Sequence, residues 1–163
     1  MIRFLSRAWY GTVAFAAFAA FTSTSFAWPL PKGSVQLTKA EVAKIYSGMT
    51  ADWDTIRGYH APDGKYYSHA KDKSWFFEGK WTVRGNTQCI SGSWTEVKTG
   101  KTGKSGKRDC NTWMRGPDGK MWDLWSQAKD QRNDWSDENL SKLSKGDRGV
   151  VKTITELKAK VRG

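Results

Sequence analysis

Short runs of aromatic and β-branched residues alternate with turn signals through the middle of the chain, between residues 50 and 127. One turn is used twice, as APDGK (61–65) and GPDGK (116–120), since Pro presets φ and Gly accepts a positive φ. A third tight turn is RGNT (84–87). This alternation predicts a mainly β protein with short flanking helices (an α+β fold). Its antiparallel meander of about six to eight strands would form a small barrel or a strongly curved sheet.

Helices are predicted on both sides of this strand region. Thr38 and Glu41 form a capping box, which predicts a first helix over 38–47. Near the C-terminus, apolar residues recur at helical spacing between lysines and predict a second helix over 150–161, which packs on the sheet or caps an open end. These apolar residues are Val150, Ile154, Leu157 and Val161.

The chain begins with the three parts of a secretory signal peptide. Two arginines and no acidic residue are followed by an uncharged apolar run over 8–21 and then by small residues. This order predicts a signal peptide over 1–27, cleaved between Ala27 and Trp28, and a single mainly β domain over 28–163. A membrane anchor is the alternative, but 14 apolar residues fall short of the roughly 20 needed to cross a bilayer. We therefore expect an exported protein, in the periplasm or secreted, with no transmembrane segment after cleavage.

Positive charge is the main feature of the composition. The whole chain has 27 basic and 16 acidic residues, and removal of the leader, which holds two of the basic ones, leaves 25 − 16 = +9. Such a surface favours an anionic envelope component, for example a phospholipid head group or an acidic polysaccharide. Solubility alone is the alternative explanation. Nucleic acid is the least fitting partner, because no recognition helix or RNA-binding signature is present.

Cys89 and Cys110 are the only cysteines of the chain. In an oxidising compartment an even pair of this kind predicts a disulfide. Closing the segment between them would stabilise the fold by about 3 kcal/mol. A metal site would need more ligands than these two and the distant His60 and His69 supply, so neither a metal nor another cofactor is predicted.

A basic stretch, TGKTGKSGKR (99–108), is at first sight similar to a phosphate-binding loop. Such a loop needs a glycine five residues before its Gly-Lys-[Ser/Thr] step, and Thr95 and Lys98 occupy those positions. We expect instead a loop between two cross-linked strands, either a solvated hairpin or a finger that contacts an anionic surface. Its candidate anion contacts are Lys101, Lys104, Lys107 and Arg108. A second polar stretch, 128–149, is also expected to be mostly loop, with one extended part around 140–143.

Tryptophan is unusually frequent, with ten in the chain and nine after the predicted cleavage. Most of these rings are expected in the core, because a buried indole removes a large apolar area from water. A few are expected to line a pocket or groove, where an indole stacks on a sugar ring or covers a lipid chain. The candidate ligand-binding residues are Tyr59, Trp75, Trp81 and Trp94.

No catalytic motif is recognisable in the sequence. His60, His69 and Glu78 stand among 11 aspartates, but none belongs to a nucleophile–base or paired-carboxylate pattern. No catalytic residue is therefore predicted.

Several stretches, in order, resemble a bacterial family of exported proteins, the domain-of-unknown-function family 995. The resemblance lies in a helix ending in Tyr-Ser-Gly (46–48), a Gly-Tyr…Asp-Gly hairpin (58–64), a Gly-x-Trp strand (79–81), the cysteine pair and a Gly-Asp turn (146–147). It implies export in a Gram-negative bacterium and carries no activity. A looser similarity relates the Gly-x-Trp strand to lipocalin-like and avidin-like β-barrels, whose interior holds one small ligand.

Three functions are consistent with these features. The first, which we favour, is a non-enzymatic periplasmic binding module for an envelope glycan, a lipid or another anionic component. The second is a hydrolase of envelope polymers. The third is a protein–protein interaction module that uses the basic loop 99–108.

Overall fold

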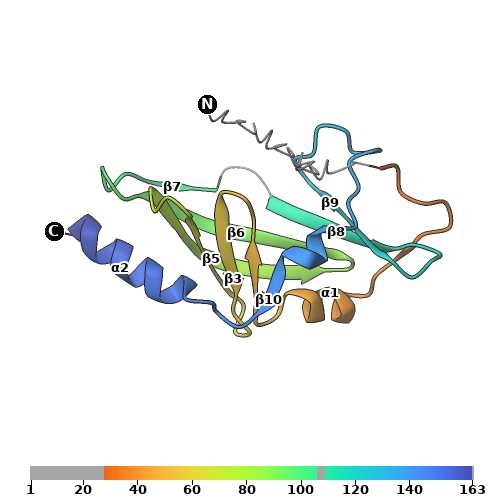
Figure 1. Ribbon diagram of the computed structural model, residues 1–163, viewed down its shortest axis with the longest axis horizontal. Helices are drawn as coiled ribbons and strands as arrows, with labels where there is room; N and C mark the ends of the chain where they lie inside the picture. Colours follow the sequence, from red (N-terminus) through yellow and green to blue (C-terminus); the bar gives the residue numbers. More distant parts are fainter. Residues whose placement is uncertain (1–27, 106–108, 163) are drawn as a thin grey trace, which may run out of the picture.

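The computed structural model describes residues 28–105 and 109–162. The predicted signal peptide with Ala27, and the candidate anion contacts Lys107 and Arg108, lie outside the described residues. Over the described part, the chain forms one strongly curled sheet, a half-barrel with an α-helix at each of two flanks (Figure 1). The predicted fold class is therefore confirmed. None of the helices in this part is long and apolar enough to cross a membrane.

The sheet has ten strands, all paired antiparallel. They are β1 (Val35–Gln36), β2 (Met49–Asp52), β3 (Ile56–His60), β4 (Lys65–Ala70), β5 (Trp75–Arg84), β6 (Thr87–Glu96), β7 (Thr102–Lys104), β8 (Asp109–Arg115), β9 (Met121–Trp125) and β10 (Leu143–Lys145). The helices are α1 (Lys39–Tyr46), the short 3-10 helix η1 (Asn139–Lys142) and α2 (Val150–Arg162). The strand order is β1-β8-β6-β5-β4-β3-β2-β10, with β7 beside β6 and β9 beside β8.

Local turn chemistry sets the register of three hairpins. The Pro-Asp-Gly-Lys turn joins β3 to β4 and again β8 to β9, with Gly64 at φ +85° and Gly119 at φ +82°. In each, the aspartate side chain accepts the N–H of the lysine two residues on. The tight turn after Arg84 joins β5 to β6. All three predicted turns are confirmed.

The basic segment that we expected to be a loop contains a strand. Residues Thr102–Lys104 form β7 and pair with residues 93–95 of β6. The expectation of an unpaired loop is wrong here because β8 covers only residues 87–90 of the same edge of β6. The rest of that edge offers free backbone groups, which β7 satisfies.

Successive side chains of a strand point to opposite faces of the sheet, and because this sheet is curled, one face is concave and the other is convex. On β5, Trp75, Phe77 and Trp81 share the concave face with their partners on β4 and β6, and Phe76 and Glu78 lie on the convex face. Because cross-strand partners share a face, the pairing extends this division across the whole sheet.

Helix α1 closes one end of the concave face. Thr38 caps the helix and exchanges hydrogen bonds with Glu41, so the predicted capping box is confirmed. Its buried residues Val42 and Tyr46 pack in one cluster with Trp113 of β8. A ligand therefore has access only to the part of the concave face beyond this cluster.

Helix α2 packs on the convex face, against β3, β4 and β5. Val150, Ile154 and Leu157 are buried and form one cluster with Phe76, which confirms the predicted apolar stripe. Lys158 adds an ion pair with Glu78, with Nζ and Oε2 2.9 Å apart. Of the two expected positions for this helix, the structure has the one on the sheet.

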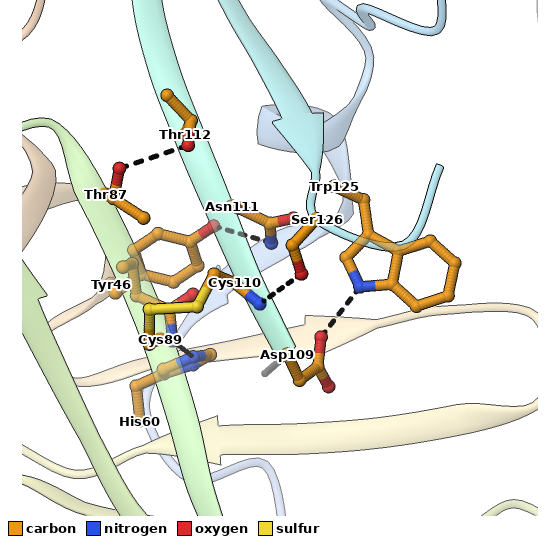
Figure 2. Close-up of a disulfide and its surroundings, with 11 residues drawn as sticks. Tyr46, His60, Thr87, Cys89, Asp109, Cys110, Asn111, Thr112, Trp125 and Ser126 are labelled. Carbon is orange, nitrogen blue, oxygen red and sulfur yellow. Dashed lines mark hydrogen bonds between the residues drawn. A yellow bond between two sulfur atoms is a disulfide. The ribbon is translucent and has the colours of Figure 1, made fainter. Parts of the chain in front are cut away.

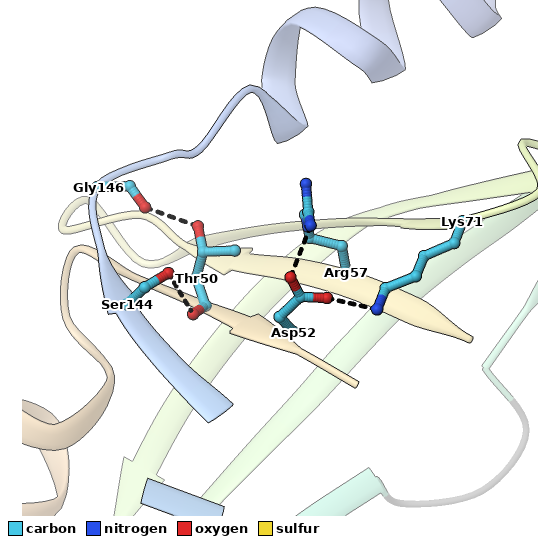
Figure 3. Close-up of polar contacts among 6 residues, drawn as sticks. All are labelled: Thr50, Asp52, Arg57, Lys71, Ser144 and Gly146. Atoms are coloured by element: carbon cyan, nitrogen blue, oxygen red, sulfur yellow. Dashed lines mark hydrogen bonds and ion pairs between the residues drawn. The ribbon is translucent and has the colours of Figure 1, made fainter. Parts of the chain in front are cut away.

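A polar network ties the start of α2 to the sheet edge (Figure 3). The Thr50 hydroxyl donates to the backbone carbonyl of Gly146 at 2.6 Å. Asp52, on the same face of β2, forms ion pairs with Arg57 at 2.6 Å and Lys71 at 2.7 Å. Hydrogen bonds from Lys71 and Arg57 lower the pKa of the Asp52 carboxyl. Of these contacts, the hydrogen bond from Thr50 holds the Gly-Asp turn against β2.

The polar stretch 128–149 is more structured than expected. An apolar cluster covers the convex side of β9, and Asp123 of β9 forms a β-bridge with Ser136. The extended part lies at 143–145, as β10, rather than at 140–143, because the backbone of β10 pairs with the edge of β2. The cluster consists of Trp122, Leu124 and Trp135.

The predicted disulfide is confirmed. Cys89 on β6 and Cys110 on β8 are cross-strand partners with their Cα atoms 4.0 Å apart (Figure 2). β6 and β8 are paired over four residues each. The covalent bond therefore reinforces a short junction in the middle of the sheet.

Candidate functional site

A cavity of about 680 Å³ lies on the concave face, in the part of the half-barrel that α1 leaves open. Its lining comes from α1, from η1 and from strands on both sides of the curl. Pockets for small ligands usually measure roughly 300–1,000 Å³. The curl of the sheet therefore produces a hollow of the size that a small ligand needs.

Aromatic side chains form the outer wall of the cavity. Trp53, Trp75 and Phe77 are half-buried, and Trp125 is 45% exposed. The Trp125 indole is held in place because its Nε1 donates to Oδ1 of Asp109 at 2.7 Å (Figure 2). The outer wall thus offers several flat apolar surfaces at the mouth of the cavity.

Uncharged polar side chains form the inner wall. Gln88 and His60 are only 1% and 2% exposed, and their Nε2 atoms lie 3.4 Å apart. Burial lowers the pKa of His60 to about 3, although a hydrogen bond with the Met49 backbone opposes the shift, so the imidazole is neutral near pH 7. Its Nδ1 has no well-aligned hydrogen-bond partner among the described residues. The inner wall consists of Tyr46, His60, Gln88, Asn111 and Asn139.

Tyr46 connects the inner wall to the core under α1. Its hydroxyl accepts hydrogen bonds from Asn111 Nδ2 and Trp113 Nε1, both at 3.2 Å. Burial raises the pKa of Tyr46 above its usual range, so the hydroxyl stays neutral. The centroids of the Tyr46 and His60 rings lie 4.6 Å apart, with the ring planes tilted by 44°, so the two rings are neighbours in the inner wall.

Asn139 is oriented by a buried carboxylate behind the cavity. Its Nδ2 lies 2.6 and 2.7 Å from the two carboxyl oxygens of Asp123, which is 1% exposed. Burial raises the pKa of Asp123 to about 7, more strongly than the Asn139 hydrogen bonds lower it. This contact also joins η1 to β9, so it holds the two sides of the curled sheet together.

A glycine makes room for Tyr66, the second tyrosine of the cavity lining. A Cβ on Gly58 would overlap the hydroxyl oxygen of Tyr66, which lines the cavity beside His60. The hydroxyl of Tyr66 therefore needs the space that Gly58 leaves empty on β3. Substitution of this glycine would displace part of the cavity lining.

The four predicted ligand-binding residues lie in four different places. Trp75 lines the cavity, and Trp94 lines a neighbouring groove. Trp81 packs against the cluster under α1, and its Nε1 donates to the Ala61 carbonyl at 2.8 Å. Tyr59 packs on the convex face against the α2 cluster. A ligand-binding role in this cavity fits Trp75 alone of the four.

The predicted anion contacts are also separated. Lys101 lines the groove beside Trp94. Lys104 is the cross-strand partner of Ser93, one residue out of phase with Trp94, and so belongs to the opposite face of the sheet. The two lysines cannot act on one small anion as a single cluster.

None of the five inner-wall residues was among the predicted ligand-binding residues, although His60 was considered for catalysis. Two of them could have been recognised from the strand pattern. Gln88 lies two residues before Ile90, and Asn111 two residues before Trp113, so each polar residue shares a strand face with an apolar one. A polar residue at an inward-facing strand position needs a partner or a ligand.

The residues considered for catalysis are dispersed. His60 lines the cavity, Glu78 is ion-paired with Lys158 on the convex face, and the buried His69 contacts the Ala70 carbonyl at 2.8 Å. Asp109 is the one carboxylate that lines the cavity among the described residues. In that part of the chain, no three His, Cys, Asp or Glu side chains converge as a metal site.

Comparison with known proteins identifies a family. A family model described as "Protein of unknown function (DUF995)" matches residues 12–148, which is most of the chain. No curated protein and no solved structure is significantly similar to the chain. The family description assigns no activity, and no solved structure supports the looser lipocalin-like similarity.

Proposed function

The chain belongs to the DUF995 family, and we propose that it is a non-enzymatic binding module that holds a sugar unit of an envelope glycan in the concave cavity. The observation that carries this proposal is the pairing of an aromatic outer wall with an uncharged, hydrogen-bonding inner wall in a cavity of about 680 Å³. A sugar ring has the complementary surface, with an apolar C–H face and a rim of hydroxyl groups.

The inner wall favours a polar ligand over a lipid chain. An apolar occupant would remove water from the half-buried Asn111 and would offer no hydrogen bond to Gln88 or His60, which is costly for buried polar groups. Sugar hydroxyls both donate and accept, so they can satisfy amide, imidazole and phenol groups in turn. Among the candidate ligands of the envelope, this selects the glycan.

We infer that the protein acts outside the cytoplasm. The disulfide between Cys89 and Cys110 is of a kind that persists in oxidising compartments. The basic and apolar leader over 1–27 has the order of a secretory signal. Envelope glycans are available to the protein in that location.

Removal of one aromatic ring from the mouth tests the proposal. We expect Trp125→Ala to weaken sugar binding about tenfold, because the loss of one stacking surface is worth roughly 1.4 kcal/mol. The matched control is Trp28→Ala, since Trp28 is 52% exposed and does not line the cavity. The measurement is isothermal titration calorimetry with N-acetylglucosamine and its β-1,4-linked tetramer, and with galacturonic acid and its tetramer. Absence of heat from all four sugars with folded protein would contradict the proposed function.

A further inference from the structure

We propose that the ligand is a linear oligosaccharide of at least two units, which runs from the cavity into a second groove beside it. This inference rests on the proposed function of the cavity. The second groove measures about 580 Å³ and lies at the end of β5 and β6. Trp75 and Phe77 line both hollows, so the two form one continuous surface over the concave face.

Trp94 gives the second groove its own stacking surface. It is the cross-strand partner of Phe77 on one side and of Gly103 on the other. A Cβ on Gly103 would come within 2.5 Å of the Trp94 indole, so the ring lies directly against the backbone of β7. Strand β7 therefore supports the Trp94 indole, which lies next to Phe77 of the cavity wall.

The far edge of the second groove is polar. Glu96 and Lys101 both line it, and the Glu96 N–H donates to the Lys101 carbonyl at 2.8 Å. The Glu96 carboxylate accepts from the Thr99 hydroxyl at 2.5 Å, which fixes its position. Lys101 forms no ion pair with any described residue, so its ammonium group is available to a ligand.

Like the cavity, the second groove combines an aromatic surface with hydrogen-bonding groups, which here lie at its far edge. A sugar unit on Trp94 would place hydroxyl groups toward Glu96 and hydroxyl or carboxylate groups toward Lys101. A single sugar cannot occupy both hollows, whereas a chain can bridge them across Trp75. The geometry therefore assigns the second groove to the next units of the same glycan.

Chain-length dependence of binding tests this proposal. Affinities of the wild-type protein are compared, by calorimetry, for each monosaccharide and its tetramer in the neutral N-acetylglucosamine and the acidic galacturonic acid series. We expect the tetramer of the preferred series to bind about tenfold more tightly than its monomer, because it adds a second stacked ring. Trp94→Ala and Lys101→Gln should each reduce this ratio at least threefold and leave monomer affinity unchanged.

Lys104→Gln is the matched control, because it removes the same charge from the same hairpin on the opposite face. Lys101 is exposed, so its variant tests the proposal even where Trp94→Ala reduces stability. Equal affinities of monomer and tetramer, or a ratio that neither groove variant changes, would overturn the proposed role of the second groove and leave the proposed role of the cavity standing. Failure of every sugar to bind would instead overturn the proposed function on which the inference rests.

Discussion

Replacement of both cysteines, as Cys89→Ala with Cys110→Ala, is expected to lower the free energy of unfolding by about 3 kcal/mol. The bond closes a loop between residues separated by 21 positions, so its loss returns conformational entropy to the unfolded chain. For a chain of this length the melting temperature should fall by roughly 10 °C. Chemical denaturation of the two proteins, followed by circular dichroism, measures the difference.

The wild-type protein in excess reductant is the control, and it should match the double variant. The bond also joins the strands that carry Gln88 and Asn111, which adjoin the two cysteines and line the cavity. Sugar affinity should therefore decrease together with stability. A double variant whose free energy of unfolding lies within 1 kcal/mol of that of the oxidised wild type would contradict a stabilising role for this bond.

Asp123→Asn is expected to make the protein more stable at alkaline pH than the wild type. Burial raises the folded-state pKa of Asp123 from 3.8 to about 7, so the folded protein favours the protonated carboxyl. The raised pKa of Asp123 favours the folded state fully below about pH 3.8, and this contribution to stability is lost as the pH rises to about 7. Relative to the wild type, the variant should gain on the order of 3 kcal/mol between pH 4 and pH 8.

The difference in the free energy of unfolding between variant and wild type isolates Asp123, because His60 changes stability with pH in the opposite direction. Its pKa is lowered to about 3, so proton uptake by the unfolded chain destabilises the fold below about pH 6.5. This contribution cancels in the comparison of variant with wild type at each pH. The control is Asp54→Asn, which removes a charge from an exposed position. A pH-independent difference between Asp123→Asn and wild type would contradict a raised pKa for Asp123.

Elements with strong local signals were predictable from the sequence. The capping box of Thr38 and Glu41 placed α1, and the repeated Pro-Asp-Gly-Lys turn placed two hairpins. The apolar stripe of α2 needed only helical periodicity. In each case the determining contacts join residues within a few positions of each other, so tertiary context was not required.

The remaining elements and most of the site depend on contacts distant in sequence. Strand β7 has the sequence Thr-Gly-Lys, which has little strand propensity, and it forms because β6 offers a free edge. The inner wall combines Tyr46 of α1 with Asn139 of η1, and only the curl of the sheet brings them together. Assignment of Tyr59 to the convex face and of Trp81 to the cluster under α1 likewise required the register of the whole sheet.

Nuclear magnetic resonance of the tryptophan indole N–H groups tests the cavity most directly, because each ring reports its own surroundings. During titration with the sugar tetramers, the signals of Trp53, Trp75 and Trp125 should shift, since these rings line the cavity. Those of Trp122 and Trp135, in the cluster on the convex side, should stay in place. Unchanged cavity signals at the highest sugar concentration, or shifts confined to the convex cluster, would contradict ligand binding in the half-barrel.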